Sequence, residues 1–188
     1  MEELDADFFR RDPLTCSRDL IGCVFRWHGC EGRIVETEAY AEHGDEACHT
    51  WNRPSAREFI ARHDAGTAYV YLNYGVHWLF NVVVKSAENS GFVLFRALEP
   101  ISGLERMRER RGDLPLHSLC SGPGKLTQAL DIDGSMHGNC FLGAENTGIR
   151  RDSAEISLSI GPRIGISRAA DRPWRFGAAG SASLSRRF

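Results

Sequence analysis

Apolar residues along this chain gather in short runs separated by turn-forming residues. Two runs, 22–27 and 33–38, flank the turn-rich segment 28–32, a pattern typical of a β-hairpin. A second pair, rich in Val, Tyr, Phe and Trp, has the residue types that favour strands. The strands expected beyond the first hairpin are 67–72, 76–84, 92–97, 154–160 and 164–167.

Two segments predict helices instead. Ser102 and Glu105 have the spacing of a capping box, so a helix is expected to open there and to close at Gly112. A short second helix is expected at 123–130. Strands outnumber helices, so we expect a mixed α+β fold on a largely antiparallel sheet. Because no internal repeat or linker precedes the Gly/Ala/Ser-rich segment at 177–185, residues 1–188 are expected to form one domain.

Composition narrows the class of protein. Apolar residues make up 42% and charged residues 26% of the chain, as in ordinary soluble globular proteins. The longest apolar stretches, near 80–84, are too short to span a bilayer. The N-terminus is acidic and lacks the pattern of a signal peptide, which predicts a cytoplasmic protein. None of the six cysteines forms a C-x-x-C pair, so we expect mostly buried free thiols.

Charge is unevenly distributed although the net charge is only −2. Residues 1–50 hold 5 Arg against 12 acids, whereas residues 150–188 hold 8 Arg against 3 acids. A basic C-terminal segment could line one face for nucleic-acid phosphates. From charge alone, a solvated surface is the simpler interpretation.

The run 33–40 contains two carboxylates that could take part in catalysis. Side chains alternate along a strand, so Glu36 and Glu38 are expected on one face. One of them could be a general base that activates water; a solvated strand face explains the pair equally well. With Asp45, Glu46 and His49 they could also form a metal site, although the spacing matches no strong ligand motif.

The second hairpin carries an unusual tip. Its turn is expected at 73–75, and Tyr74 there has no core to enter. Proteins that act on DNA insert such side chains between bases, but a Tyr folded back on its own strands is common. Tyr69 and Tyr71 share a face, where they could stack on a base or serve as ordinary sheet residues.

Another candidate is the segment 121–125. Ser121, Gly122 and Lys125 stand at a predicted helix start, where free amides favour a phosphate. The glycine spacing is not that of a Walker A loop, so a DNA phosphate suits it better than a nucleotide. A plain turn and cap is at least as good an interpretation.

These segments together resemble the alkyladenine DNA glycosylase family, the mammalian-type 3-methyladenine DNA glycosylases. The likeness extends from about Leu4 to the C-terminus, with several motifs in the family's order. They are the segments 33–40 (RIVETEAY), 69–81 (from YVY through YG to Asn81), 93–100 (VLFRALEP) and 119–126 (LCSGPGKL). The resemblance implies a single curved-sheet domain with a protruding hairpin, like the C-terminal domain of formyltransferases.

The resemblance also implies roles. Glu38 matches the water-activating carboxylate, Arg96 an arginine that helps hold the water, and Ile164 a residue whose carbonyl also holds it. Tyr74 matches the side chain that fills the gap left in the duplex. Residues implied to contact the flipped base are Tyr40, His49, Tyr71 and Asn81.

The implied enzyme is monofunctional, uses no metal or other cofactor, and acts as a monomer on double-stranded DNA that contains damaged purines. It would be cytoplasmic, or associated with the nucleoid in a bacterium. One departure is the segment 51–60, where the family usually shows Thr-Pro-Arg followed by Met-Phe-Gly and where a loop is expected to border the pocket. Two rivals remain: a metal-dependent hydrolase using Glu36, Glu38, Asp45 and His49, and a non-catalytic damage binder.

Overall fold

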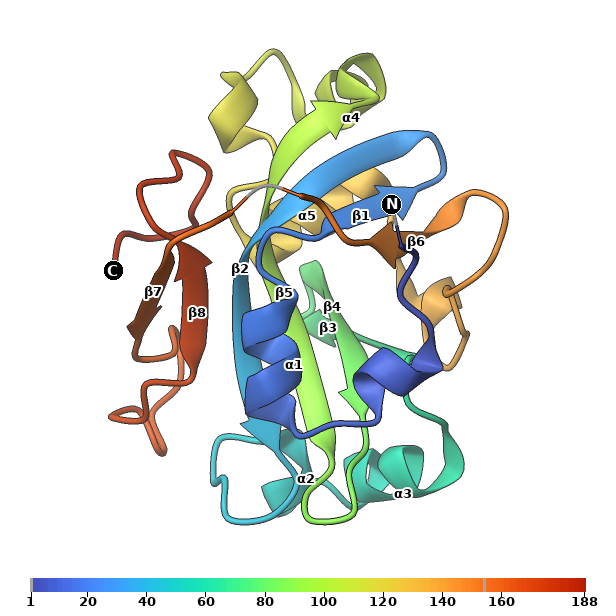
Figure 1. The fold of residues 1–188 in the computed structure, drawn as a ribbon, viewed down its shortest axis with the longest axis vertical. Helices are drawn as coiled ribbons and strands as arrows, with labels where there is room; N and C mark the ends of the chain where they lie inside the picture. Colours follow the sequence, from blue (N-terminus) through green and yellow to red (C-terminus); the bar gives the residue numbers. More distant parts are fainter. Residues whose placement is uncertain (1, 154) are drawn as a thin grey trace.

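Antiparallel strands form one curled sheet, which the helices cover in short segments (Figure 1). The computed structural model of the protein describes residues 2–153 and 155–188. Within that part, the main path through the sheet is β3-β4-β5-β2-β1-β6, and β8 joins β2 to the outer strand β7. The strands are β1 (Val24–Trp27), β2 (Cys30–Ala41), β3 (Ala68–Asn73), β4 (His77–Val84), β5 (Gly91–Ser102), β6 (Thr147–Arg150), β7 (Leu158–Gly161) and β8 (Arg175–Ala178).

Strand β2 is the centre of this arrangement. Along one edge it pairs with β5, whereas its other edge is shared by β1 near the start and β8 further on. Three irregularities interrupt its pairing with β5, the first of them between Glu31 and Gly32. At the other two, Ile34 lies opposite Leu98 and Glu36 opposite Ala97, while Thr37 already lies opposite Phe95. One residue on each strand is therefore skipped, Val35 on β2 and Arg96 on β5. Such bulges re-aim side chains, and here one of the re-aimed residues is a predicted site residue.

Short helices pack around the sheet. Helix α1 starts where the Asp12 carboxylate accepts hydrogen bonds from two main-chain amides, and it lies against β2. There the Ser17 hydroxyl donates to the Thr37 hydroxyl over 2.9 Å. The α-helices are α1 (Pro13–Asp19), α2 (His49–Asn52), α3 (Pro54–Arg62), α4 (Leu104–Arg111) and α5 (Pro123–Leu130). The 3₁₀ helices are η1 (Ala6–Phe9), η2 (Leu116–Ser118) and η3 (Gly134–Met136). Among the described residues, no helix is long and apolar enough to cross a membrane.

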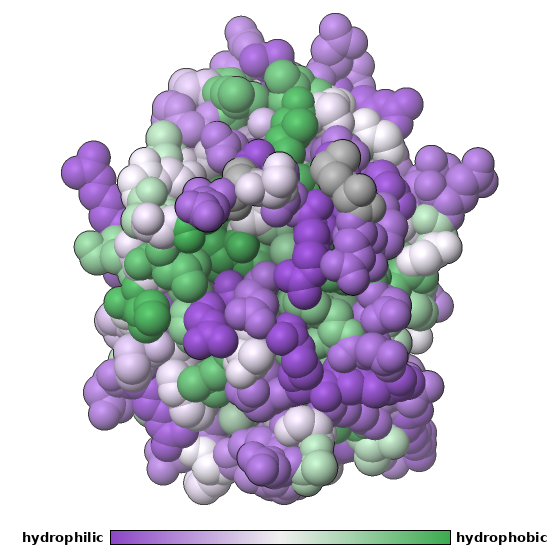
Figure 2. Space-filling model, viewed as in Figure 1, coloured by the Kyte–Doolittle hydropathy of each residue, from purple (hydrophilic) through white to green (hydrophobic). Residues whose placement is uncertain are grey.

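Aromatic rings fill the main core. Phe25 on β1 contacts Phe80 on β4 and Phe95 on β5, with ring centroids 5.4 Å apart in both pairs. Each such pair contributes about 0.5–1.5 kcal/mol beyond its burial, which ties the three strands together. A smaller cluster that includes Phe59 and Tyr69 lies under the hairpin. On the face shown in Figure 2, apolar side chains gather over β7 and β8, where Leu158 and Ile160 are exposed.

Both predicted hairpins are confirmed, and so is the helix at 123–130. The strand expected at 92–97 is longer, because its pairing with β2 continues to Ser102. Helix α4 ends at Gly112 as expected, but the capping box is wrong. Its N-cap is Gly103, with φ +75° and no side-chain cap, since Ser102 still belongs to the sheet.

The C-terminal third differs most from expectation. Of the predicted strand 154–160, only 158–160 is a strand, as part of β7, and Ala154 lies outside the described residues. Residues 164–167 form an irregular loop instead of a strand. Strand β8 begins just before the Gly/Ala/Ser-rich segment 177–185 and extends into it. It was not expected, since its Gly and Ala residues do not favour strands. The six cysteines are free; five are buried and Cys140 is exposed.

Candidate active site

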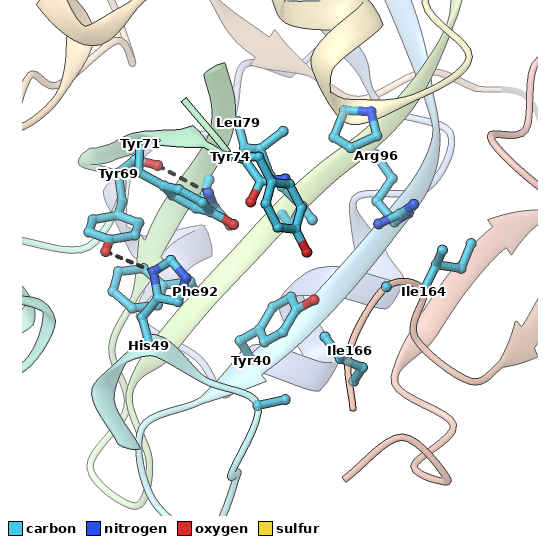
Figure 3. A pocket seen from close by; sticks show the side chains of 16 residues that line it. Tyr40, His49, Tyr69, Tyr71, Tyr74, Leu79, Phe92, Arg96, Ile164 and Ile166 are labelled. Carbon is cyan, nitrogen blue, oxygen red and sulfur yellow. Dashed lines mark hydrogen bonds between the residues drawn. The ribbon is translucent and has the colours of Figure 1, made fainter. Parts of the chain in front are cut away.

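A cavity of about 320 Å³ opens between the β3–β4 hairpin, strand β2, helix α2 and the loop 164–166 (Figure 3). Its wall is mostly aromatic and apolar, with a few polar groups among them, as is usual for sites that bind small molecules or bases. The lining residues are Tyr40, Ala47, His49, Tyr69, Tyr71, Asn73, Tyr74, Leu79, Asn81, Phe92, Leu94, Arg96, Pro123, Ile164, Gly165 and Ile166.

Glu38 lies just behind this wall, with a side chain that is fully buried. Its Oε2 accepts hydrogen bonds from the Tyr40 hydroxyl at 2.8 Å and from Arg96 Nη1 at 3.3 Å. Its Oε1 accepts from the main-chain N–H of Ile164 at 2.7 Å. All three donors line the cavity, so the carboxylate is held where three wall residues meet.

Burial raises the pKa of the Glu38 carboxyl above its usual value. The Arg96 charge, the Ile164 amide and the Tyr40 hydroxyl lower it, and the neighbouring Glu36 raises it further. Removal from water outweighs the three lowering interactions. A carboxylate with a raised pKa is a better proton acceptor than an ordinary one, which suits a general base.

Arg96 reaches both predicted carboxylates from the bulge in β5. Its Nε donates to Glu36 at 3.2 Å while its Nη1 faces Glu38. Glu36 is also fully buried, but Arg175 and Ser185 bind it as well, at 3.1 Å and at 2.6 and 2.8 Å. The solvated-face interpretation is therefore wrong for both glutamates, and their surroundings differ: Glu38 faces the cavity wall and Glu36 the C-terminal residues.

A buried ion pair supports the other side of the site. Both side chains of Asp45 and Arg163 are fully buried, and the guanidinium binds both carboxylate oxygens at 2.6 and 2.7 Å. Arg163 also donates to the Ala39 carbonyl and lies over the Tyr40 ring, 4.6 Å from its centroid. The sequence patterns do not indicate this arginine, although it directly precedes the predicted site residue Ile164 in the chain.

The donors of the alternative metal site do not converge. Among residues 2–153 and 155–188, no three or more His, Cys, Asp or Glu side chains form a group that could hold a metal ion. Each donor has another partner: Glu36 binds Arg96 and Arg175, Glu38 binds Arg96, Asp45 binds Arg163 and His49 binds Tyr69. The buried carboxylates are thus paired with arginines.

The predicted base-contacting side chains do converge. Tyr40, His49, Tyr71 and Asn81 all line the cavity (Figure 3). The His49 and Tyr71 rings meet edge to face with centroids 4.5 Å apart, and His49 Nδ1 lies 3.0 Å from the Tyr69 hydroxyl. Asn81 is held by a hydrogen bond from Nδ2 to the Tyr69 carbonyl. Tyr69 therefore supports the cavity in addition to lining it.

Burial shifts the pKa values of all four of these rings, and two of the shifts bear on the chemistry of the cavity. Burial and the Arg53 charge lower the pKa of His49 to about 4, so the imidazole is uncharged at neutral pH. Burial and the Glu38 charge raise the pKa of Tyr40 well above its usual value, so its hydroxyl remains a donor. Stacking on a cationic ring is favoured by uncharged aromatic faces, whereas a protonated imidazole would repel it.

Tyr74 stands at the tip of the β3–β4 hairpin. Its side chain is 90% exposed, yet it also lines the mouth of the cavity (Figure 3). Both central turn residues have positive φ, +51° for Tyr74 and +70° for Gly75, and Val76 closes the turn onto the Asn73 carbonyl at 3.0 Å. Positive φ is uncommon for a Tyr. Because 90% of the Tyr74 side chain is exposed, the alternative of a ring folded back on its own strands is wrong.

The start of α5 lies beside this hairpin. Pro123 lines the cavity, and a side chain at Gly124 would come within 2.8 Å of the His77 Cβ on β4. Gly122 is the helix N-cap without a side-chain cap, and exposed Lys125 lies 3.4 Å from the Ser121 hydroxyl. The segment is therefore placed next to the cavity.

Half of the surplus arginines at 150–188 have acidic partners. Four of the eight pair with carboxylates: Arg150 with Glu31, Arg151 with Glu2, Arg163 with Asp45 and Arg175 with Glu36. One expectation needs correction. The segment 51–60 is not a loop at the pocket. It forms parts of α2 and α3, and Phe59 packs behind Tyr69 with centroids 5.0 Å apart.

Comparison with known proteins gives a consistent picture. The family model described as methylpurine-DNA glycosylase matches residues 7–182. A protein of Agrobacterium fabrum is 47% identical over 99% of this chain and 94% of its own length. Others from Rhodopseudomonas palustris (strain HaA2) and Chlorobaculum tepidum are 46% and 41% identical, over 95% and 99% of this chain and 88% and 92% of their own lengths. All three bear the provisional name 3-methyladenine DNA glycosylase.

Proposed function

This chain belongs to the methylpurine-DNA glycosylase family and is a DNA glycosylase of DNA repair, and from this premise we propose that it flips damaged purines out of duplex DNA and hydrolyses their N-glycosidic bond. One observation carries the proposal. A buried carboxylate, Glu38, lies directly behind the wall of an aromatic cavity and accepts hydrogen bonds from three of the residues that line it. A flipped base would enter that cavity with its sugar directed toward Glu38.

The proposed substrates are alkylated or deaminated purines of the class of 3-methyladenine, 7-methylguanine, hypoxanthine and ethenoadenine. Tyr40, Tyr71 and uncharged His49 offer faces that favour electron-poor or cationic rings. Asn81 would crowd the exocyclic amino group of guanine and so exclude that normal base. Its side chain is buried and tied to the Tyr69 carbonyl, which makes it a rigid obstacle.

The proposed reaction is attack by water at C1′ of the extruded nucleotide. As the bond between the base and C1′ breaks, its electron pair leaves with the base and the sugar gains positive charge. The ionised Glu38 stabilises that charge and takes a proton from the water as the new C1′–O bond forms. Arg96 and the Ile164 carbonyl would hold the water. Cationic methylated bases leave as neutral molecules and need no added proton.

The proposed docking on DNA uses the surface around the cavity mouth. Tyr74 would fill the gap that the flipped nucleotide leaves, since its ring is exposed on a defined turn. Ser121, Gly122 and Lys125 at the start of α5 would hold a phosphate beside it. We propose that the domain acts as a monomer on double-stranded DNA in the cytoplasm, or at the nucleoid if the source is bacterial.

The test is release of free base from alkylated duplex DNA, measured with and without a chelator. The proposed function predicts that 3-methyladenine and 7-methylguanine are both released, and that the chelator does not change the rate of release of either base. Loss of activity with the chelator would favour a metal-dependent hydrolase. Tight binding of damaged duplex without any release would favour a non-catalytic binder.

A further inference from the structure

The last residues of the chain lie against the buried face of the active-site carboxylates. We call residues 183–188 the tail. The main-chain N–H of Ser185 donates to Glu36 Oε2 at 2.6 Å and its hydroxyl to Glu36 Oε1 at 2.8 Å. Arg175 on β8 donates to the main-chain carbonyls of Arg186 and Arg187, both at 3.2 Å, and stacks on the Phe188 ring at 3.8 Å. The tail is thus docked through several independent contacts.

Ser185 also contacts the arginine of the site. Its hydroxyl lies 3.4 Å from Arg96 Nη2, while Arg96 Nε binds Glu36 and Nη1 binds Glu38. The guanidinium therefore has a different partner for each of its three nitrogens. Because a guanidinium is planar, fixing Nε and Nη2 determines where Nη1 points.

The charges of this cluster balance. Glu36 and Glu38 carry two negative charges, and Arg96 and Arg175 two positive ones. The other ionisable groups that interact with Glu38 are Tyr40 on its own strand, Tyr71 on β3 and Arg163 in the neighbouring loop. Two of the four described hydrogen-bond donors to Glu36 come from Ser185, and they carry no charge. Without them, Glu36 would attract Arg96 more strongly.

We propose that Ser185 is a positioning residue for catalysis, which acts through Glu36 and Arg96 on Glu38. The inference rests on the proposed function, because it takes Glu38 to be the general base. The Ser185 hydroxyl donates a hydrogen bond to Glu36 and accepts one from Arg96 Nη2. These two bonds keep Arg96 Nη1 in position to donate to Glu38. When the hydroxyl is removed, Arg96 turns toward Glu36 and its attraction on Glu38 weakens. The Glu38 carboxylate then takes up a proton at a higher pH.

The experiment uses matched variants of the full chain. Ser185→Thr and Ser185→Val have nearly the same shape and differ in the hydroxyl, and Ser185→Ala removes it with the least steric change. Ser181→Ala is the control, because Ser181 accepts a hydrogen bond from the Ser183 amide and is not among the donors to Glu36. Single-turnover base release from methylated duplex is measured as a function of pH. The ¹³C chemical shift of the Glu38 carboxyl, assigned by its loss in Glu38→Gln, is titrated in the free protein.

Loss of the hydroxyl should slow base release about threefold to tenfold, the range expected for one hydrogen bond. In Ser185→Ala and Ser185→Val the acidic limb of the rate and the Glu38 titration should both move to higher pH. Ser185→Thr and Ser181→Ala should behave as the unchanged protein does, and binding to abasic-site duplex should be unaffected in all four.

Two results would overturn the inference. One is an unchanged rate and Glu38 titration in Ser185→Ala and Ser185→Val; the other is an equal loss in Ser185→Thr and Ser185→Val, which would make the hydroxyl irrelevant. If Ser185→Ala does not fold, the comparison of Ser185→Thr with Ser185→Val still tests whether the hydroxyl matters. Failure of the unchanged protein to release any base would reject the proposed function, whereas the carboxyl titration would still test the link from Ser185 to Glu38.

Discussion

The main-chain amide of Ile164 donates a 2.7 Å hydrogen bond to the carboxylate of Glu38, although the two residues are 126 positions apart in the chain. The amide is placed there by the preceding residue, Arg163, whose guanidinium is anchored to Asp45 beneath Tyr40. The contact therefore joins the carboxylate to a loop that has no strand or helix of its own. It gives the proposed general base a hydrogen-bond donor whose position depends on a buried ion pair.

Replacing Glu38 by Gln should reduce single-turnover base release by about 10²–10⁴-fold, the usual contribution of a general base. Binding to duplex with an abasic-site mimic should be retained, because the amide keeps the shape of the carboxylate. Since burial disfavours the charged form, the variant should have a thermal midpoint at least as high as the unchanged protein at pH 7. That difference should shrink as the pH falls through the raised pKa of Glu38. Near-normal turnover would remove Glu38 from the mechanism.

The rate should fall on the acidic side with a midpoint above the usual pKa of a glutamate. Burial raises the pKa of Glu38, and the protonated form cannot accept a proton from water. His49 should not set this limb, because its pKa is lowered to about 4 and it is already uncharged at higher pH. The measurement is the pH dependence of single-turnover release for the unchanged protein and for His49→Gln. An acidic limb that disappears in His49→Gln would contradict the assignment to Glu38.

Replacing Tyr74 by Ala should weaken binding to damaged duplex more than binding to undamaged duplex. The difference should be about tenfold or more, because base–aromatic stacking contributes about 1–3 kcal/mol. Tyr74→Phe keeps the ring and should bind nearly as the unchanged protein does. Both affinities are measured by fluorescence anisotropy with matched duplexes. Equal losses on the two duplexes would make Tyr74 an ordinary structural residue.

Breaking the ion pair between Asp45 and Arg163 should destabilise the fold. Asp45→Asn keeps the size of the side chain but leaves a buried guanidinium without its counter-charge. Loss of one partner of a buried pair costs about 3–5 kcal/mol, which chemical denaturation would measure. Asp152→Asn is the control, since its bond to Arg33 is partly exposed and should contribute much less. A loss below that of the control would show that the pair does not hold the loop.

The enzyme should leave an intact abasic site, and borohydride should trap no covalent complex with damaged DNA. Strand cleavage by a Schiff-base route needs an amine, and the chain has only two lysines. Neither lines the cavity: Lys125 lies at the start of α5, and Lys85 lies just beyond β4. Arginine cannot replace them because it stays protonated. A strong trapped band that is lost in Lys85→Ala or Lys125→Ala would identify a nucleophile and refute hydrolysis by water alone.

The sequence by itself determined the local elements that form the cavity walls. Runs of apolar and strand-forming residues on either side of the turns at 28–32 and 73–75 predict both hairpins, because such residues favour strands and the turn residues between them reverse the chain. Tyr74 could be placed at an exposed tip because the turn follows from its neighbours. The roles of Glu38, Arg96, Ile164 and the aromatic residues came from the motifs of the family resemblance; their side chains meet at one cavity.

Only the tertiary structure decided which charged groups pair. Nothing in the local pattern distinguishes Glu36 from Glu38, which occupy one strand face two residues apart. They differ because the tail and β8 bring Ser185 and Arg175 to the first, and a loop brings the Ile164 amide to the second. Such partners lie more than 120 positions away, in segments of weak periodicity. Their positions follow from how β2 divides its outer edge between β1 and β8, a property of the assembled sheet.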